Sequence, residues 1–128
     1  MKKILVVDDE KPTLSMCRLF LGSYGYEVFT AEDVESGFEI FERERPPIVL
    51  TDIKMPGPDG FSLLERIKAV APETEVILVT GHGDKGLAET AVTLGASDFI
   101  SKPMNRNEIE SALKRAEKKI RLSTTALN

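Results

Sequence analysis

Five residues of this chain have types and positions that favour chemistry. They are three aspartates, a threonine and a lysine: Asp8, Asp9, Asp52, Thr80 and Lys102. Each comes at the end of a short, largely apolar run, which is typical of a parallel strand buried on both faces. Because the carboxyl ends of parallel strands meet at one edge of a sheet, we expect the five side chains to converge in one crevice.

The types of these residues indicate phosphoryl transfer to a carboxylate. Clustered aspartates raise one another's pKa and repel unless a cation joins them. Mg²⁺ is a suitable cation because it prefers a few carboxylate oxygens and keeps several waters. Lys102 would add a compact positive charge and Thr80 a hydroxyl donor, so that a dianionic group attached to Asp52 would be surrounded. We therefore expect Mg²⁺ to be the cofactor.

The elements that position these residues alternate along the chain. Strands are expected over 3–7, 26–31, 47–52, 75–79 and 98–101, and helices over 11–21, 34–44, 61–70, 85–94 and 106–122. Alternating strands and helices with short connections predict an α/β sandwich with right-handed crossovers. The domain is expected over 1–122, with 123–128 as a flexible tail or the start of a linker.

Helix ends are marked by capping residues. Asp33 is expected to cap the second helix, and Asn105 with Glu108 forms an Asn variant of the capping box for the last helix. Five cations near the end of that helix are interpreted as opposing the negative end of its dipole, in preference to a DNA-binding surface. They are Lys114, Arg115, Lys118, Lys119 and Arg121.

Composition excludes several classes of protein. The 128 residues are 41% hydrophobic, which suits one ordinary core, and the net charge is 17 − 21 = −4. A mildly acidic chain lacks the electrostatic footprint of a nucleic-acid binder, so we expect no direct nucleic-acid binding. No apolar run approaches a membrane span, and we expect a cytoplasmic protein without membrane contact. The single Cys17 is expected to be a small core or boundary residue.

The motifs around the five residues resemble those of receiver domains of bacterial two-component response regulators. The similarity runs from about Lys3 to Lys119, in the order and at the spacing of the family. The motifs are Val6-Val7-Asp8-Asp9-Glu10, Leu50-Thr51-Asp52-Ile53-Lys54-Met55-Pro56-Gly57, Val79-Thr80-Gly81 and Ile100-Ser101-Lys102-Pro103. The resemblance implies a flavodoxin-like (βα)5 three-layer sandwich, with a five-stranded parallel sheet in strand order 2-1-3-4-5.

The resemblance also implies partners and ligands for the site. Asp52 would be the phosphoacceptor and would take its phosphoryl group from a phosphohistidine on a sensor histidine kinase or a phosphotransfer protein. Asp9 would bind Mg²⁺ directly, Asp8 chiefly through water, and Lys54 through its backbone carbonyl. Such a domain is not an enzyme in the usual sense, because it catalyses only its own phosphorylation and dephosphorylation.

A switch is implied by the same resemblance. Thr80 and Phe99 would be the switch pair, and activation would reshape the surface of the fourth helix, fifth strand and fifth helix, where an output domain or protein binds. A homodimer on phosphorylation is a further expectation. Phe99 stands where many family members have Tyr, so its orientation would depend on packing. His82 is interpreted first as an exposed loop residue, and the alternative is that His82 and Lys54 set the rate of water attack on the phosphoryl group.

Other functions are less consistent with the sequence. A nucleotide- or flavin-binding domain would need glycines or hydroxyls after the first strand, which instead reads Asp8-Asp9-Glu10-Lys11-Pro12. Phosphatases of the haloacid dehalogenase type carry an acid where this chain has Lys54. A degenerate receiver that serves as a non-phosphorylated binding module usually lacks a key residue, and all five are present here. The chain could be a stand-alone phosphoryl shuttle or the N-terminal receiver of a longer regulator or hybrid kinase.

Overall fold

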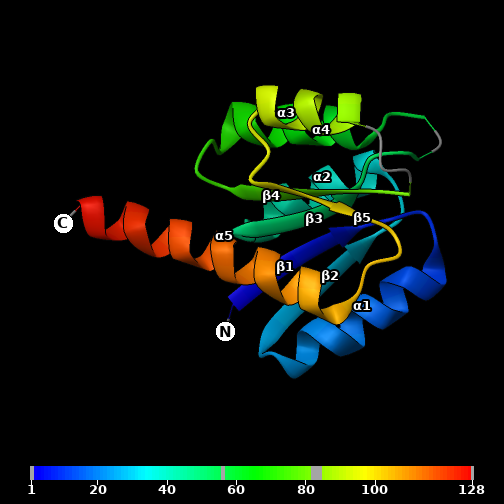
Figure 1. Ribbon diagram of the computed structural model, residues 1–128, viewed down its shortest axis with the longest axis horizontal. Helices are drawn as coiled ribbons and strands as arrows, with labels where there is room; N and C mark the ends of the chain where they lie inside the picture. Colours follow the sequence, from blue (N-terminus) through cyan, green and yellow to red (C-terminus); the bar gives the residue numbers. More distant parts are fainter. Residues whose placement is uncertain (1, 56, 82–84, 128) are drawn as a thin grey trace.

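A five-stranded parallel sheet lies between two layers of helices (Figure 1). The computed structural model describes residues 2–55, 57–81 and 85–127. The strand order β2-β1-β3-β4-β5 confirms the expected topology. The elements are β1 Lys2–Val7, α1 Lys11–Ser23, β2 Tyr26–Ala31, α2 Val34–Glu44, β3 Ile48–Asp52, α3 Gly60–Val70, β4 Glu75–Thr80, α4 Lys85–Thr93, β5 Asp98–Ser101 and α5 Arg106–Leu127.

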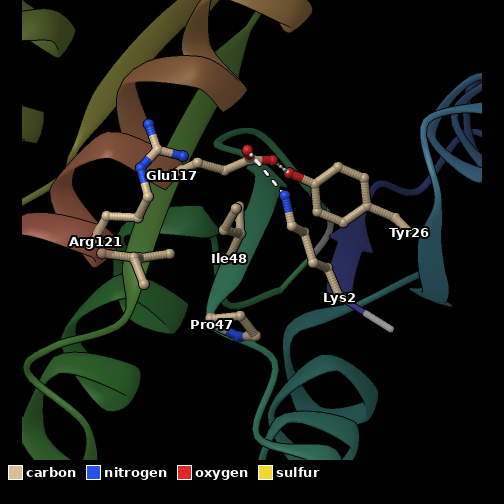
Figure 2. Close-up of a pocket in the computed structure, with 7 residues that line it drawn as sticks. Lys2, Tyr26, Pro47, Ile48, Glu117 and Arg121 are labelled. Atoms are coloured by element: carbon tan, nitrogen blue, oxygen red, sulfur yellow. Dashed lines mark hydrogen bonds and ion pairs between the residues drawn. The ribbon is translucent and has the colours of Figure 1, made fainter. Parts of the chain in front are cut away.

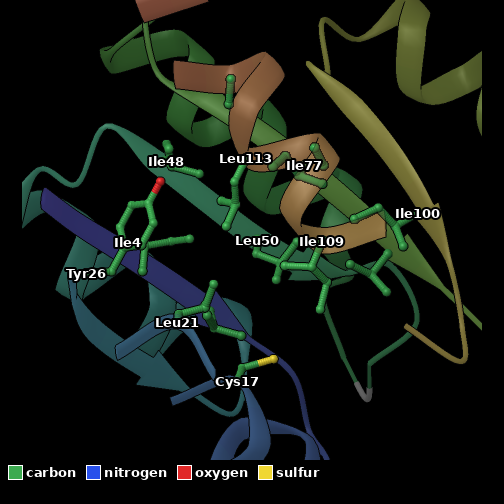
Figure 3. Packing of buried hydrophobic residues seen from close by; sticks show 14 of the residues in the cluster. Ile4, Cys17, Leu21, Tyr26, Ile48, Leu50, Ile77, Ile100, Ile109 and Leu113 are labelled. Carbon is green, nitrogen blue, oxygen red and sulfur yellow. The ribbon is translucent and has the colours of Figure 1, made fainter. Parts of the chain in front are cut away.

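The sheet separates two hydrophobic cores because alternate strand residues point to opposite faces. Ile4 and Val6 of β1 belong to the core beneath α1 and α5, whereas Leu5 and Val7 belong to the core beneath α2, α3 and α4. Figure 3 shows the first core, in which Cys17 packs beside the aliphatic side chains. Cys17 is fully buried, as expected, and burial raises the pKa of its thiol to about 11.

The strand register aligns the carboxyl ends of the inner strands. Val7 of β1 pairs with Thr51 of β3, and Asp52 at the end of β3 pairs with Val79 of β4. Thr80, the last residue of β4, pairs with Ser101, the last residue of β5. Asp8, Asp52, Thr80 and Lys102 therefore lie at or just beyond one edge of the sheet.

Two predicted helix caps are confirmed. The Asp33 carboxylate accepts a hydrogen bond from the Ser36 amide (2.7 Å), which satisfies one of the free donors at the start of α2. The Asn105 side chain accepts from the Glu108 amide (2.8 Å) and donates to the Glu108 carboxylate (2.9 Å). This pair closes the first turn of α5, and so fixes the chain that leads from Lys102 into the helix.

The ends of two helices differ from the prediction. Helix α1 continues through Gly22 to Ser23, and the turn that follows is made by Gly25, whose φ is 89°. Helix α5 continues to Leu127, whereas the sequence predicted an end near Leu122. A helix that is already formed propagates at little cost, and residues 123–127 contain no glycine or proline to stop it. The predicted tail is therefore largely helical, while the domain boundary at 122 stays a prediction.

The extension of α5 places its five basic residues before the last turn of the helix. With the helix running to Leu127, the last turn contains none of the five cations, which end at Arg121. Opposition to the helix dipole acts mainly in the last turn and cannot account for them. The interpretation of this cluster as a dipole partner is wrong.

None of the described helices combines the length and apolar character needed to cross a membrane.

Candidate functional site

Asp52 is held at the end of β3 by the chain on both sides of it. Its side chain is buried, with a residue exposure of 6%. After it, the Ile53 amide donates to the Val79 carbonyl (2.8 Å), and the Gly60 amide donates to the Ile53 carbonyl (2.8 Å). Gly60 packs directly on this strand end, where a Cβ would overlap the Asp52 carbonyl oxygen and come within 2.8 Å of Ile53 Cα. The backbone that presents the Asp52 carboxylate is thus tightly constrained.

Lys102 binds three carboxylates at once. Its Nζ lies 3.0 Å from Asp52 Oδ2, 3.1 Å from Asp8 Oδ2 and 3.2 Å from Glu10 Oε1. An ammonium group has three N–H donors, so each donor has its own carboxylate. Lys102 is only 19% exposed at its side chain, whereas Glu10 is 64% exposed. The two buried aspartates are therefore its stronger partners, and Glu10 is a weaker third.

Burial and charge oppose each other in this group. Burial raises the pKa of Asp8, and the neighbouring Asp52 charge adds to this, while the Glu10 amide and Lys102 partly offset it. Burial by itself would lower the pKa of Lys102, but the hydrogen bonds and charges of Asp52 and Asp8 outweigh burial and raise it above the ordinary range. Lys102 is accordingly a fixed cation across the physiological range of pH.

The donor set suits a hard divalent cation. Among the described residues, one carboxylate oxygen each from Asp8, Glu10 and Asp52 lie within 4.8 Å of one another. Three carboxylates and no sulfur or imidazole fit the preference of Mg²⁺ for oxygen ligands. Asp9 is exposed and is not part of this group of three. The expected direct role of Asp9 stays a prediction.

Glu10 is the member of the site that sequence reasoning missed. It lies within the quoted motif, but a glutamate three residues past a strand end resembles an ordinary solvated side chain. The signal was its spacing from Asp8. The Glu10 amide donates to Asp8 Oδ1 (2.8 Å), so the chain turns back and brings the Glu10 carboxylate toward Lys102.

The remaining predicted site residues are Thr80, Phe99, Lys54 and His82. Thr80 is fully buried, and its carbonyl accepts from the Lys102 amide (2.6 Å), which joins the ends of β4 and β5. Phe99 on β5 is partly buried and packs against the core beneath α4. The Lys54 side chain is exposed, two residues after Asp52. His82 lies outside the described residues.

The fold and this site define a response regulator receiver domain. The family profile described as the response regulator receiver domain matches residues 4–114, and the chain belongs to this family. A receiver domain protein from Clostridium thermocellum has a similar structure, with a TM-score of 0.88 and 34% identity, covering 98% of this chain and 99% of that one. The expected family and fold are thus confirmed.

Curated relatives differ in length. Sporulation initiation phosphotransferase F of Bacillus subtilis is 33% identical over 89% of this chain and 92% of its own length. The transcriptional regulatory protein FixJ of Bradyrhizobium diazoefficiens is 36% identical, but the match covers 89% of this chain and only 58% of FixJ. The structure of NtrX from Brucella abortus is similar with a TM-score of 0.91 and 34% identity, and the match covers 98% of this chain but only 29% of the NtrX chain. The chain therefore spans about half or less of several longer relatives.

Proposed function

We propose that this domain is a phosphoacceptor and that Asp52 receives the phosphoryl group. The observation that carries the proposal is a buried aspartate at a strand end whose Oδ2 lies 3.0 Å from the ammonium of Lys102. The donor would be a phosphohistidine on a sensor histidine kinase or phosphotransfer protein. A carboxylate oxygen of Asp52 forms the new P–O bond, the P–N bond of the donor breaks, and the imidazole keeps the electron pair.

Lys102 stabilises the transferred group in this proposal. All three of its N–H donors bind carboxylates in the structure, so a bond to a phosphoryl oxygen requires the release of one of them. Phosphorylation removes the ionic charge of the Asp52 carboxylate itself, which weakens that hold. Lys102 then binds the phosphoryl oxygens. Its ammonium group is a preorganised positive charge at the place where negative charge develops during transfer.

The acidic group would hold Mg²⁺. Asp52 and Asp8 would be joined by Asp9, Glu10 or both, and by the backbone carbonyl of Lys54. When bound, the ion supplies positive charge that lowers the repulsion between Asp52 and the incoming phosphoryl oxygens. The three carboxylates that lie within 4.8 Å of one another support this site.

The output of the domain is proposed to pass through the α4-β5-α5 face. Thr80, at the end of β4, would bind the phosphoryl group with its hydroxyl, and the ring of Phe99 would turn inward as the switch. A downstream domain or protein, or a second copy in a homodimer, would bind this face. Lys54 and His82 are proposed to tune the phosphoryl lifetime. A stand-alone shuttle and the receiver of a longer regulator both remain consistent with the lengths of the relatives.

Intact mass after incubation with Mg²⁺ and acetyl phosphate tests the proposal. We expect one phosphoryl adduct on the wild-type protein, none on Asp52→Asn, and none when Mg²⁺ is omitted. The matched control is Asp59→Asn. Asp59 lies in the loop after Asp52 and caps α3 by accepting a hydrogen bond from the Ser62 amide (3.1 Å), and asparagine can keep that bond. An adduct that persists on Asp52→Asn would place the phosphoryl group elsewhere. A wild-type protein that takes up no phosphoryl group from acetyl phosphate or from a phosphorylated kinase would contradict the function.

A further inference from the structure

A strongly basic surface lies on α5, far from the Asp52 crevice. Five cations lie within residues 114–121, and all are exposed: Lys114, Arg115, Lys118, Lys119 and Arg121. The whole chain, by contrast, has a net charge of −4. Two of the five are occupied at the β5 side, where Arg115 binds Asp98 (2.6 Å) and Lys119 donates to the Ser97 carbonyl (3.1 Å). The remaining three need another explanation.

These three cations share one edge of the molecule with Lys2. The side chain of Lys114 is 77% exposed, and its contact with Glu110 is long, at 3.9 Å. Lys2 begins β1 and binds Glu117 of α5 (3.0 Å). The Glu117 carboxylate also accepts a hydrogen bond from the Tyr26 hydroxyl, so two donors already use this carboxylate. We call Lys2, Lys114, Lys118 and Arg121 the basic edge.

A pocket of about 200 Å³ opens beside the basic edge, where the strands begin (Figure 2). Pro47, Ile48 and Ile120 give it an apolar lining, and the lining also includes Lys2, Arg121 and the paired Tyr26 and Glu117. Sites for whole small molecules are usually about 300–1,000 Å³. A pocket of this size suits a single apolar side chain, which indicates a peptide anchor in preference to a complete small ligand.

We propose that the basic edge and its pocket bind an acidic peptide segment of a partner protein, with one apolar side chain of that segment in the pocket. Charge complementarity selects acidic residues on either side of the anchor. A nucleic acid would offer phosphates but no aliphatic side chain for the pocket. A membrane-binding face would present protruding apolar side chains, whereas the apolar lining here lies in a pocket that charged side chains also line. The site is at the opposite edge of the sheet from Asp52 and is independent of the proposed phosphorylation.

The test measures binding of a labelled peptide by fluorescence anisotropy. The probe is a short peptide of aspartate and glutamate with one central leucine. A comparison peptide has alanine in place of the leucine. We expect the wild-type chain and Asp52→Asn to bind the leucine peptide equally, and the alanine peptide to bind about tenfold more weakly because the aliphatic contact is lost. We also expect Lys118→Gln with Arg121→Gln to weaken binding about tenfold, for two exposed ionic contacts.

The charge-matched control is Arg43→Gln with Arg45→Gln at the end of α2, which should leave binding unchanged. Circular dichroism checks that both double variants are folded. Equal binding of the leucine and alanine peptides would overturn the role of the pocket. Binding of an oligonucleotide or of phosphatidylserine vesicles as tight as that of the leucine peptide would show a general polyanion surface and overturn the proposal. No measurable binding of the leucine peptide would overturn it as well.

Discussion

Gly60 is the residue that fixes how Asp52 is presented. It begins α3, and its amide binds the Ile53 carbonyl at close range. A methyl group at this position would meet backbone atoms of Asp52 and Ile53, which cannot move aside as a flexible side chain can. The glycine is therefore required by a close approach of two backbone segments, not by a turn.

Gly60→Ala is expected to destabilise the domain by about 1–3 kcal/mol, the usual cost of overpacking a tight contact. Gly22→Ala is the matched control, because Gly22 lies within α1 and nothing stands within 4 Å of the position of its Cβ. That control should stabilise the domain by about 0.5–1 kcal/mol through helix propensity. Urea unfolding of both variants measures the two effects. A neutral Gly60→Ala would show that the strand end tolerates displacement.

Residue types and strand ends were enough to predict the contacts among Asp8, Asp52 and Lys102. Asp52 ends β3, Asp8 and Lys102 directly follow β1 and β5, and the register brings these strand ends together. Glu10 could not be found in this way, because its place depends on how the chain turns after β1. The exposure of Asp9 likewise follows from that local turn and not from the alternation of the strand.

Helix α5 is tied to the start of the sheet by Glu117, which binds Lys2 of β1 and Tyr26 of β2. Burial by itself would raise the pKa of Glu117, but the hydrogen bonds from Tyr26 and Lys2 outweigh burial and lower the pKa from its ordinary value. A carboxyl group whose pKa is lowered by folding stabilises the folded state above its unfolded pKa. That contribution is lost as the pH falls through the folded-state pKa.

Glu117→Gln is therefore expected to lower the free energy of unfolding by about 1 kcal/mol at pH 7. The difference from wild type should shrink as the pH falls below 4.5, the ordinary pKa of the group. Urea unfolding across this pH range is the measurement, with Glu39→Gln, an exposed position on α2, as the control. A difference that is the same at every pH would show that the ionic form of Glu117 does not matter.

The starts of α2 and α5, which side chains cap, were predicted, whereas the ends of α1 and α5 were missed. Asp33 and Asn105 each bind an amide of the first turn, and both starts were predicted. The end of α5 has no such residue in the sequence. Its length depends on the small balance between helix propagation and fraying, which the types of residues 123–127 do not decide.

For the molecule as a whole, the α5 residues whose burial the structure describes contribute to the core only up to Ile120. The buried residues of α5 that belong to a core are Ile109, Ala112, Leu113 and Ala116, with Ile120 partly buried. A chain that ends at Leu122 should unfold with the same free energy as the full chain, within about 0.5 kcal/mol. A chain that ends at Lys114 loses Ala116 and Ile120 and should be destabilised by more than about 2 kcal/mol.

Denaturant unfolding of both truncated chains tests where the domain ends. Equal stability of the 1–122 chain and the full chain would support the predicted boundary. A loss of more than about 1 kcal/mol in the 1–122 chain would mean that the last turns of α5 contribute to the fold.

The three carboxylates around Lys102 also affect how readily free phosphate compounds approach Asp52. Their formal charges and that of the ammonium sum to −3 + 1 = −2. Free phosphate compounds that drift toward these groups meet like charge and an ammonium whose donors are all in use. Mg²⁺ bound to the carboxylates would lower this repulsion, both for acetyl phosphate and for a phosphohistidine donor. A phosphoacceptor at Asp52 would therefore take up little phosphate when the cation is absent.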